Sequence, residues 1–180
     1  SPIMPLGAPR RIDNVYNRVV VGSDGTPASL VTVGHAAGVA TAADADLFVV
    51  SAYRPQPRPG QATPTPAAGE RQELYGEEAA RGAILRSVKE LKRERARNID
   101  HRIVEGDPAY ALLETAGSDP KNLIVVGNRG LGAEAGEALG SVPREVVKNA
   151  VCDVMVVQID TEDSQISSQG DQTSGRDGPN

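Results

Sequence analysis

The sequence predicts an α/β fold in which helices cover both faces of a parallel sheet. Short apolar runs alternate along the chain with longer segments of helical pattern, as in repeated strand–helix–strand units. The apolar runs 19–21 and 123–126 are continuous rather than alternating, which is typical of strands buried on both faces. Capping residues, such as the pair Thr26-Pro27, mark the point where a strand segment gives way to a helix.

The composition limits the classes of partner. The chain has 180 residues and a formal net charge of −5, most of it in the segment 160–180. The remaining chain is close to neutral, so we expect no nucleic-acid partner. No apolar stretch reaches the length of a membrane span, so we expect no membrane partner and a cytoplasmic location. The single cysteine, Cys152, excludes an intramolecular disulfide, and we expect it to be a buried structural thiol.

Three segments are expected along the chain. Residues 1–17 contain three prolines and no hydrophobic period, which predicts a flexible N-terminal arm. Residues 18–159 carry the strand and helix patterns and form the domain. Residues 160–180 are rich in Ser, Gln, Gly and Asp, which predicts a disordered acidic tail.

The first half of the domain contains two strands around one helix. We expect the first strand at 18–23 and the second at 47–53. Thr26 and Pro27 predict the start of the intervening helix, which runs to about residue 43. The segment 54–69 is rich in Pro, Ala and Thr, and we expect it to be an exposed, mobile loop.

The second half repeats the alternation. A long helix is expected over about 71–97, where Ile84, Val88 and Leu91 mark one apolar face. The triplet Gly106-Asp107-Pro108 predicts the start of another helix, which ends near Gly117. The remaining strands and helix are expected at 101–105, 123–127, 141–149 and 154–159.

A glycine-rich loop follows the strand at 123–127. Its glycines recur at 127, 130, 132, 136 and 140, and Ser141 opens the next helical pattern, which gives the spacing G-x2-G-x9-G-S. Glycines let backbone N–H groups approach an anion closely, and we expect Gly127 and Gly140 to serve this purpose. Ser141 is expected to cap the helix and to offer its hydroxyl to a phosphate. The spacing differs from those of the P-loop and of the dinucleotide fingerprint.

A second candidate element follows the first strand. Ligands of parallel sheets bind at the carboxyl ends of the strands, where the winding reverses. The loops after the first and fourth strands carry Asp24 and the glycine motif, respectively. Asp24 is therefore a candidate ligand-binding residue. The alternative for Asp24 is a turn residue that hydrogen-bonds its own backbone.

These residues resemble the universal stress protein family. The resemblance rests on Asp24-Gly25-Thr26, on the glycine spacing that ends in Gly140-Ser141 and on the final apolar strand, and it covers about 18–159. It implies a Rossmann-like, five-stranded parallel sheet of order 3-2-1-4-5. It also implies a homodimer. We expect the dimer to form through the strand 154–159, because a bare apolar sheet edge must be covered or paired.

The resemblance also implies an adenine-nucleotide site. Gly22 and Ser23 would line the base, Asp24 would lie near the adenine or the ribose, and Ala52 would cover the adenine. The second loop would hold ribose and phosphate. The implied site residues are Gly22, Ser23, Asp24, Ala52, Val126, Gly127, Arg129, Gly130, Gly140, Ser141 and Val142.

The ligand is either cyclic AMP or ATP. The motifs look most like an actinobacterial branch of the family that favours cyclic AMP. Pro143 lacks an N–H group that a longer phosphate chain would use, whereas Arg129 adds a charge that would also suit a triphosphate. Mg²⁺ would accompany ATP.

The leading interpretation is a nucleotide-binding stress or signalling protein rather than a dedicated enzyme. His35 and His101 have no evident nucleophile partner, and two histidines and one cysteine argue against a zinc site. One alternative is a slow ATPase or nucleotidyl-transfer enzyme, for which Asp24, Glu134 or Glu137 would hold a metal. The other is an interaction module whose nucleotide site has decayed. The fold alone does not separate these functions.

Overall fold

The computed structural model describes residues 15–64, 73–94, 96, 98–129 and 139–159. Their centre is a five-stranded, all-parallel sheet of order β3-β2-β1-β4-β5, which confirms the predicted class and strand order. The strands are β1 (Arg18–Gly22), β2 (Asp46–Tyr53), β3 (Ile99–Glu105), β4 (Asn122–Arg129) and β5 (Asp153–Ile159).

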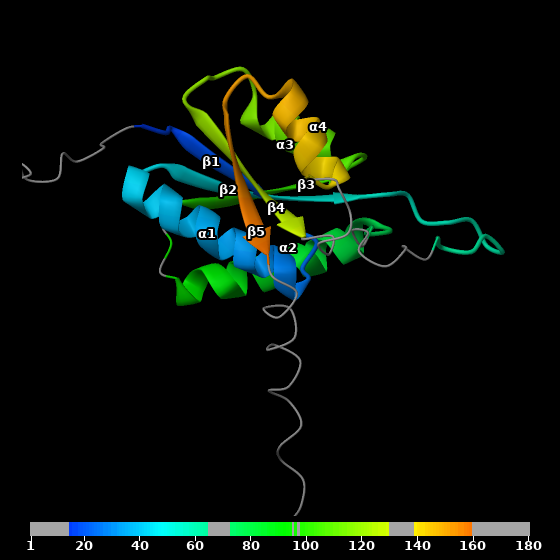
Figure 1. Cartoon of the computed structure of the whole chain (residues 1–180). Helices are drawn as coiled ribbons and strands as arrows, with labels where there is room; N and C mark the ends of the chain where they lie inside the picture. The colour runs from blue at the N-terminus through cyan, green and yellow to red at the C-terminus, as the bar shows by residue number, and fades with distance from the viewer. Residues whose placement is uncertain (1–14, 65–72, 95, 97, 130–138, 160–180) are drawn as a thin grey trace, which may run out of the picture.

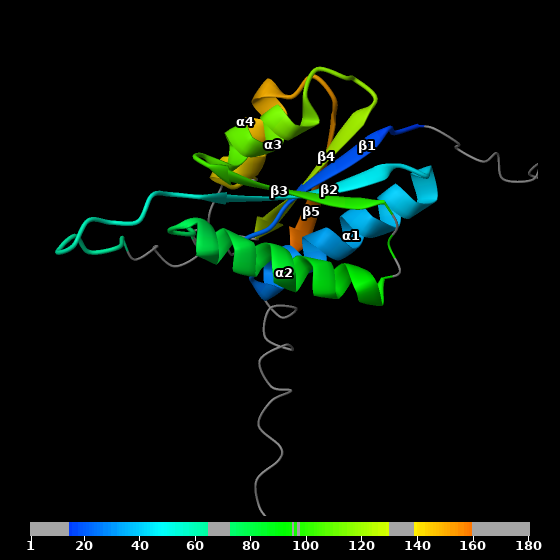
Figure 2. The same ribbon diagram turned by 180° about the vertical axis from the view of Figure 1, so that it is seen from behind.

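Helices lie on both faces of this sheet. α1 (Pro27–Ala43) and α2 (Glu77–Arg93) cover one face, and α3 (Pro108–Ala116) and α4 (Ser141–Asn149) cover the other (Figures 1 and 2). In Figure 1 the first pair lies below the sheet and the second pair above it. Two of these helices begin as predicted, since Thr26 caps α1 and Asp107 caps α3, each followed by proline.

The two faces of the sheet have separate apolar cores. Along β1, Val19 and Val21 belong to the core beneath α1 and α2, whereas Val20 belongs to the core beneath α3 and α4. Because successive side chains of a strand point to opposite faces, a continuous apolar run fills both cores. Alanines, including Ala36 and Ala40 of α1, let the helices pack closely on the sheet.

The helix predicted over 71–97 is shorter in the structure. Its described part is α2, which begins at Glu77 and ends at Arg93. Leu74 and Gly76 are instead held against Arg54, whose N–H donates to Leu74 O at 2.7 Å and whose carbonyl accepts from Gly76 N at 2.8 Å. Gly76 has a φ of +81°, which a helix interior does not allow. The predicted helix start was therefore wrong because these backbone groups bond to the end of β2.

The segment after β2 leaves the body of the domain. Residues 55–64 run outwards from the carboxyl end of β2, as the cyan arm of Figure 1 shows. Most of their side chains are exposed, in agreement with the predicted loop. An open hollow of about 550 Å³ lies along this arm between its prolines and Tyr75. The rest of the predicted loop, residues 65–69, lies outside the described residues.

Two residues that precede β1, Tyr16 and Asn17, are hydrogen-bonded to other parts of the domain. The Tyr16 hydroxyl donates to Asp153 at 2.9 Å, and Asn17 N donates to Lys121 O at 2.9 Å. Cys152 is partly buried and packs against the core beneath α3 and α4. This burial raises the pKa of its thiol, as expected for a structural cysteine. No helix in the described part of the chain is long and apolar enough to cross a bilayer.

Candidate functional site

The loops after β1 and β4 lie at one edge of the sheet. β1 and β4 are parallel neighbours, with Val21 opposite Val125, so both strands end on the same side. The order β2-β1-β4 also makes this the point where the winding of the sheet reverses. Such a reversal leaves a crevice at the carboxyl ends of the strands, where α/β proteins bind ligands.

Asp24 is built into the turn that starts α1. Its Oδ1 accepts from the Thr26 N–H at 3.0 Å and from the Thr26 hydroxyl at 2.5 Å, and the residue is 4% exposed. This is the turn geometry that the sequence left open as the alternative role of Asp24. Thr26 in turn accepts from Ser29 N at 3.3 Å. Asp24 therefore shapes the β1 loop, whatever else its carboxylate contacts.

The Ser23 hydroxyl faces the interior rather than the crevice. It accepts from the Ser87 hydroxyl at 2.8 Å and from the Gly25 N–H at 3.1 Å, and it lies 3.2 Å from the Ser29 hydroxyl. Ser23 is 1% exposed. A ligand at this loop would therefore meet the backbone of Ser23, since the side chain is engaged with α1 and α2.

α2 also contacts Gly25 of the β1 loop. The Arg86 Nε donates to the Gly25 carbonyl at 3.1 Å. Gly25 has a φ of +75°, and a Cβ atom there would lie 2.9 Å from the Ala83 Cα. Glycine at this position is therefore required by the backbone conformation and by the packing of α2 against the loop.

Gly127 is a packing glycine. A Cβ atom built on it would lie 2.6 Å from Thr32 Oγ1 of α1 and 2.8 Å from Ile159 Cδ1 of β5. The space that a side chain would occupy is thus filled by the protein itself. The sequence-based interpretation, in which Gly127 is bare to admit a ligand, does not match this geometry. Gly140 differs, because its Cβ direction meets no atom closer than 3.7 Å.

Asn128 closes the base of the glycine loop. Its Oδ1 accepts from the Gly140 N–H at 3.0 Å, and its Nδ2 donates to Gln158 Oε1 at 3.2 Å. The Asn128 residue is 5% exposed. The end of β4 and the start of α4 are therefore adjacent, although residues 130–138 lie between them outside the described part of the chain. Asn128 was not predicted as a site residue. The signal available in the sequence was an amide side chain directly after Gly127, at the end of a buried strand.

α4 begins differently from the prediction. Gly140, not Ser141, is the N-cap residue, and no side chain of the described chain caps the helix. Ser141 is the first helical residue and is exposed, so the expectation that it caps α4 was wrong. Of the first three residues of α4, Pro143 has no N–H group. The N–H groups of this turn, at the positive end of the helix dipole, are therefore those of Ser141 and Val142.

The other predicted residues have less distinctive surroundings. Gly22 and Ala52 lie at the ends of β1 and β2, where a Cβ atom on Gly22 would make ordinary contacts with Leu112. Val126 is buried in the core beneath α3 and α4, and Val142 packs against it. The side chain of Arg129, and Gly130, Glu134 and Glu137 altogether, lie outside the described residues.

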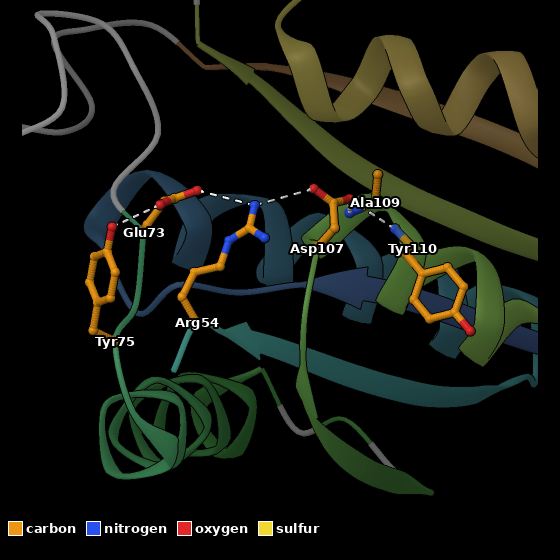
Figure 3. A network of polar contacts seen from close by, with 6 residues as sticks. All are labelled: Arg54, Glu73, Tyr75, Asp107, Ala109 and Tyr110. Atoms are coloured by element: carbon orange, nitrogen blue, oxygen red, sulfur yellow. Dashed lines mark hydrogen bonds and ion pairs between the residues drawn. The ribbon is translucent and has the colours of Figure 1, made fainter. Parts of the chain in front are cut away.

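A polar cluster lies beyond β2 on the same edge of the sheet. Figure 3 shows Arg54 between two carboxylates, with its Nη2 atom 3.4 Å from Glu73 and 3.7 Å from Asp107. Tyr75 donates to Glu73 at 3.0 Å, and partial burial together with this bond raises the pKa of Tyr75. Asp107 also accepts from the first N–H groups of α3. The cluster connects the arm after β2 to the start of α3.

Within the described ranges, no three His, Cys, Asp or Glu side chains are placed to hold a metal ion. His35 lies on α1 with its Nδ1 2.9 Å from the Val31 carbonyl, and His101 is an exposed residue of β3. Both histidines therefore lie at the surface.

Known proteins resemble this chain over most of its length. The sequence model of the universal stress protein family matches residues 15–158. The universal stress protein Rv1636 of Mycobacterium tuberculosis is 39% identical over 145 residues, which cover 80% of this chain and 97% of the relative. The universal stress protein MJ0531 of Methanocaldococcus jannaschii is 33% identical over 152 residues, covering 83% and 86%.

A solved structure of a universal stress protein in complex with cAMP is also similar. It is 34% identical to this chain, with a TM-score of 0.58, and the match covers 79% of this chain and 96% of that one. Both the sequence and the fold of this chain therefore match those of known universal stress proteins.

Proposed function

The chain belongs to the universal stress protein family, and on this premise we propose that it binds an adenine nucleotide in the crevice between the β1 and β4 loops. Cyclic AMP is the first candidate ligand and ATP the second. The proposed site comprises the residues that the sequence singled out, and Ser23 and Gly127 would contribute through their backbone. These residues are Gly22, Ser23, Asp24, Ala52, Val126, Gly127, Arg129, Gly130, Gly140, Ser141 and Val142.

The observation that carries the proposal is the uncapped start of α4. Ser141 and Val142 present N–H groups that no side chain of the described chain satisfies, at the edge where the β4 loop ends. An anion is the natural partner for such groups, because it receives hydrogen bonds and is stabilised by the helix dipole. The small residues Gly22 and Ala52 lie near the ends of the neighbouring strands, where we expect the purine to bind.

Among the described residues, the donors at the start of α4 match a single phosphate group. Gly140 N–H is engaged by Asn128, and Pro143 has none, so Ser141 and Val142 contribute two donors. A phosphodiester needs fewer donors than a triphosphate does. The structure of a relative in complex with cAMP supports the same choice.

A pair of variants at Ser141 tests the site. Proline is well tolerated at the first position of a helix, and the Gly140 ψ of 173° suits a residue that precedes proline. Ser141→Pro therefore removes one N–H group without disturbing α4, whereas Ser141→Ala keeps it and removes the hydroxyl. We expect calorimetry with cyclic AMP to show a loss of about tenfold or more for Ser141→Pro and a smaller one for Ser141→Ala.

The wild-type measurement decides the proposal itself. Calorimetry with cyclic AMP, AMP and ATP, with and without Mg²⁺, ranks the ligands. Absence of binding by all three would refute the proposal and favour a protein that acts through interactions alone. Equal affinities for Ser141→Pro and wild type would move the phosphate away from α4.

The proposed role is binding rather than dedicated catalysis. A slow ATPase would need a carboxylate to hold a metal ion near the phosphates, and Oδ1 of Asp24 is already engaged by both donors of Thr26. Turnover of ATP with Mg²⁺ that disappears in Asp24→Ala would refute this part of the proposal.

We further propose that the protein forms a homodimer through β5. The two edge strands differ in character. β3 has the exposed polar residues Asp100, His101 and Arg102, which discourage edge pairing. β5 has the partly exposed apolar residues Val154 and Val156. Antiparallel pairing of β5 with its copy would close a two-fold contact.

A further inference from the structure

The Asn128 side chain joins two elements that do not otherwise meet through side-chain hydrogen bonds among the described residues. Its carbonyl oxygen holds the Gly140 N–H, which belongs to the residue that begins α4. Its amide nitrogen holds Gln158, which lies opposite it in the register of β4 and β5. Asn128 is buried, whereas Gln158 is exposed on the edge strand.

Both ends of this amide are used, which fixes its orientation. Oδ1 can only accept and Nδ2 can only donate, so reversing the amide would place Nδ2 against the Gly140 N–H, which is also a donor. Leaving a buried amide group without its partner costs more than an average hydrogen bond contributes. The position of Gly140 is therefore tied to the position of Gln158 through one rigid group.

We propose that Asn128 is a positioning residue of the nucleotide site and that it couples the start of α4 to the edge strand β5. This inference rests on the proposed function. By holding Gly140 N–H, Asn128 fixes the cap residue, so that the N–H groups of Ser141 and Val142 keep their place for the phosphate. A shift of Gln158, as when β5 pairs with another strand, is transmitted to the same N–H groups, and a bound nucleotide acts on β5 in return.

Four variants separate the two halves of the proposal. Asn128→Leu has a similar volume and removes both hydrogen bonds. Gln158→Leu removes the contact to β5 and leaves the Gly140 contact, while Gln158→Glu keeps an oxygen that accepts from Asn128. Asn149→Leu is the matched control, because Asn149 lies at the far end of α4 and its side-chain amide donates to Glu145 of the same helix.

Calorimetry with cyclic AMP is the first measurement. We expect Asn128→Leu to weaken binding about tenfold or more and Gln158→Leu to weaken it about two- to fivefold. Gln158→Glu and Asn149→Leu should bind as the wild type does. Amide hydrogen exchange followed by NMR is the second measurement. The Gly140 N–H should exchange much faster in Asn128→Leu than in the wild type without nucleotide.

The outcomes distinguish this inference from the proposed function. If the wild type binds cyclic AMP and Asn128→Leu binds it equally well, the positioning role is overturned while the function stands. If Gln158→Leu and Gln158→Glu bind alike, the coupling to β5 is overturned. If the wild type binds none of the adenine nucleotides, the proposed function fails and the positioning role fails with it. Should Asn128→Leu not fold, the exposed Gln158 pair still decides the coupling to β5. The Gly140 N–H of the wild type without nucleotide then decides the positioning role, because rapid exchange of this group would show that Asn128 does not hold it.

Discussion

Thr32 of α1 fills the space beside Gly127 of β4, so that a methyl group on Gly127 would lie 2.6 Å from the Thr32 hydroxyl oxygen. At such a distance something must shift, either the side chains of Thr32 and Ile159 or the backbone that carries them. We expect Gly127→Ala to lower the free energy of unfolding by about 1–3 kcal/mol, as overpacking of a buried site does. Urea denaturation, with the midpoint compared at an unchanged slope, measures this loss.

Two further variants identify the cause of that loss. Gly140→Ala is the control without a clash, because a Cβ atom there meets nothing closer than 3.7 Å. It should lose less stability than Gly127→Ala, about 1 kcal/mol at most, since alanine is a poorer helix cap than glycine. Thr32→Ala removes the clashing oxygen, so the double variant with Gly127→Ala should lose less than the sum of the two single variants. Strict additivity of the two changes would contradict the packing explanation.

The fold was predictable because the chain alternates clearly between two periods. Continuous apolar runs such as 19–21 predict buried parallel strands, and Thr26-Pro27 and Asp107-Pro108 predict two helix starts that the structure confirms. The start of α2 was not predictable. It depends on hydrogen bonds between Arg54 and the residues around Leu74, which are distant in sequence.

The candidate site was predictable as a pair of loops and not in its internal contacts. The glycine spacing locates the loop after β4. The space beside Gly127, however, is filled by residues of α1 and β5, which lie far from it in the sequence. The partner of Asn128 is Gln158, thirty positions away, and no local pattern connects them. Likewise, the choice between Gly140 and Ser141 as helix cap depends on backbone angles that both residues allow.

Cys152 predicts a dependence of stability on alkaline pH. Burial raises the pKa of its thiol in the folded protein above the unfolded value of about 8.5. Since the folded state favours the protonated thiol, its contribution to stability is complete below the unfolded pKa. That contribution is lost as the pH rises through the folded pKa.

Alkylation and denaturation measure this effect. Alkylation of Cys152 by iodoacetamide accelerates as the thiol ionises, because the thiolate is the reactive form. The pH at which the rate rises should be higher in the native protein than in urea. Cys152→Ala should lose less stability than the wild type between pH 8 and pH 10, taken as roughly the range around the ordinary thiol pKa. Native and unfolded protein with the same alkylation profile would show that the thiol is not shielded.

The proposed dimer predicts that a charge on β5 produces monomers. Val156 lies on the edge strand and is partly exposed, so Val156→Lys leaves room for the ammonium group to reach water. In a dimer paired through β5, the two introduced charges would lie in one interface, where like charges repel. Val157 is less suitable for this test, because it is 6% exposed and belongs to the core beneath α1.

Light scattering at micromolar concentration checks this prediction. We expect a dimer for the wild type, a monomer for Val156→Lys and a dimer for the control His101→Lys, which places the same charge on the opposite edge strand β3. The melting temperature of Val156→Lys should become independent of protein concentration, whereas that of the wild type should rise with it. A monomeric wild type would refute pairing through β5. A dimer that persists in Val156→Lys would mean that another surface holds the two copies together.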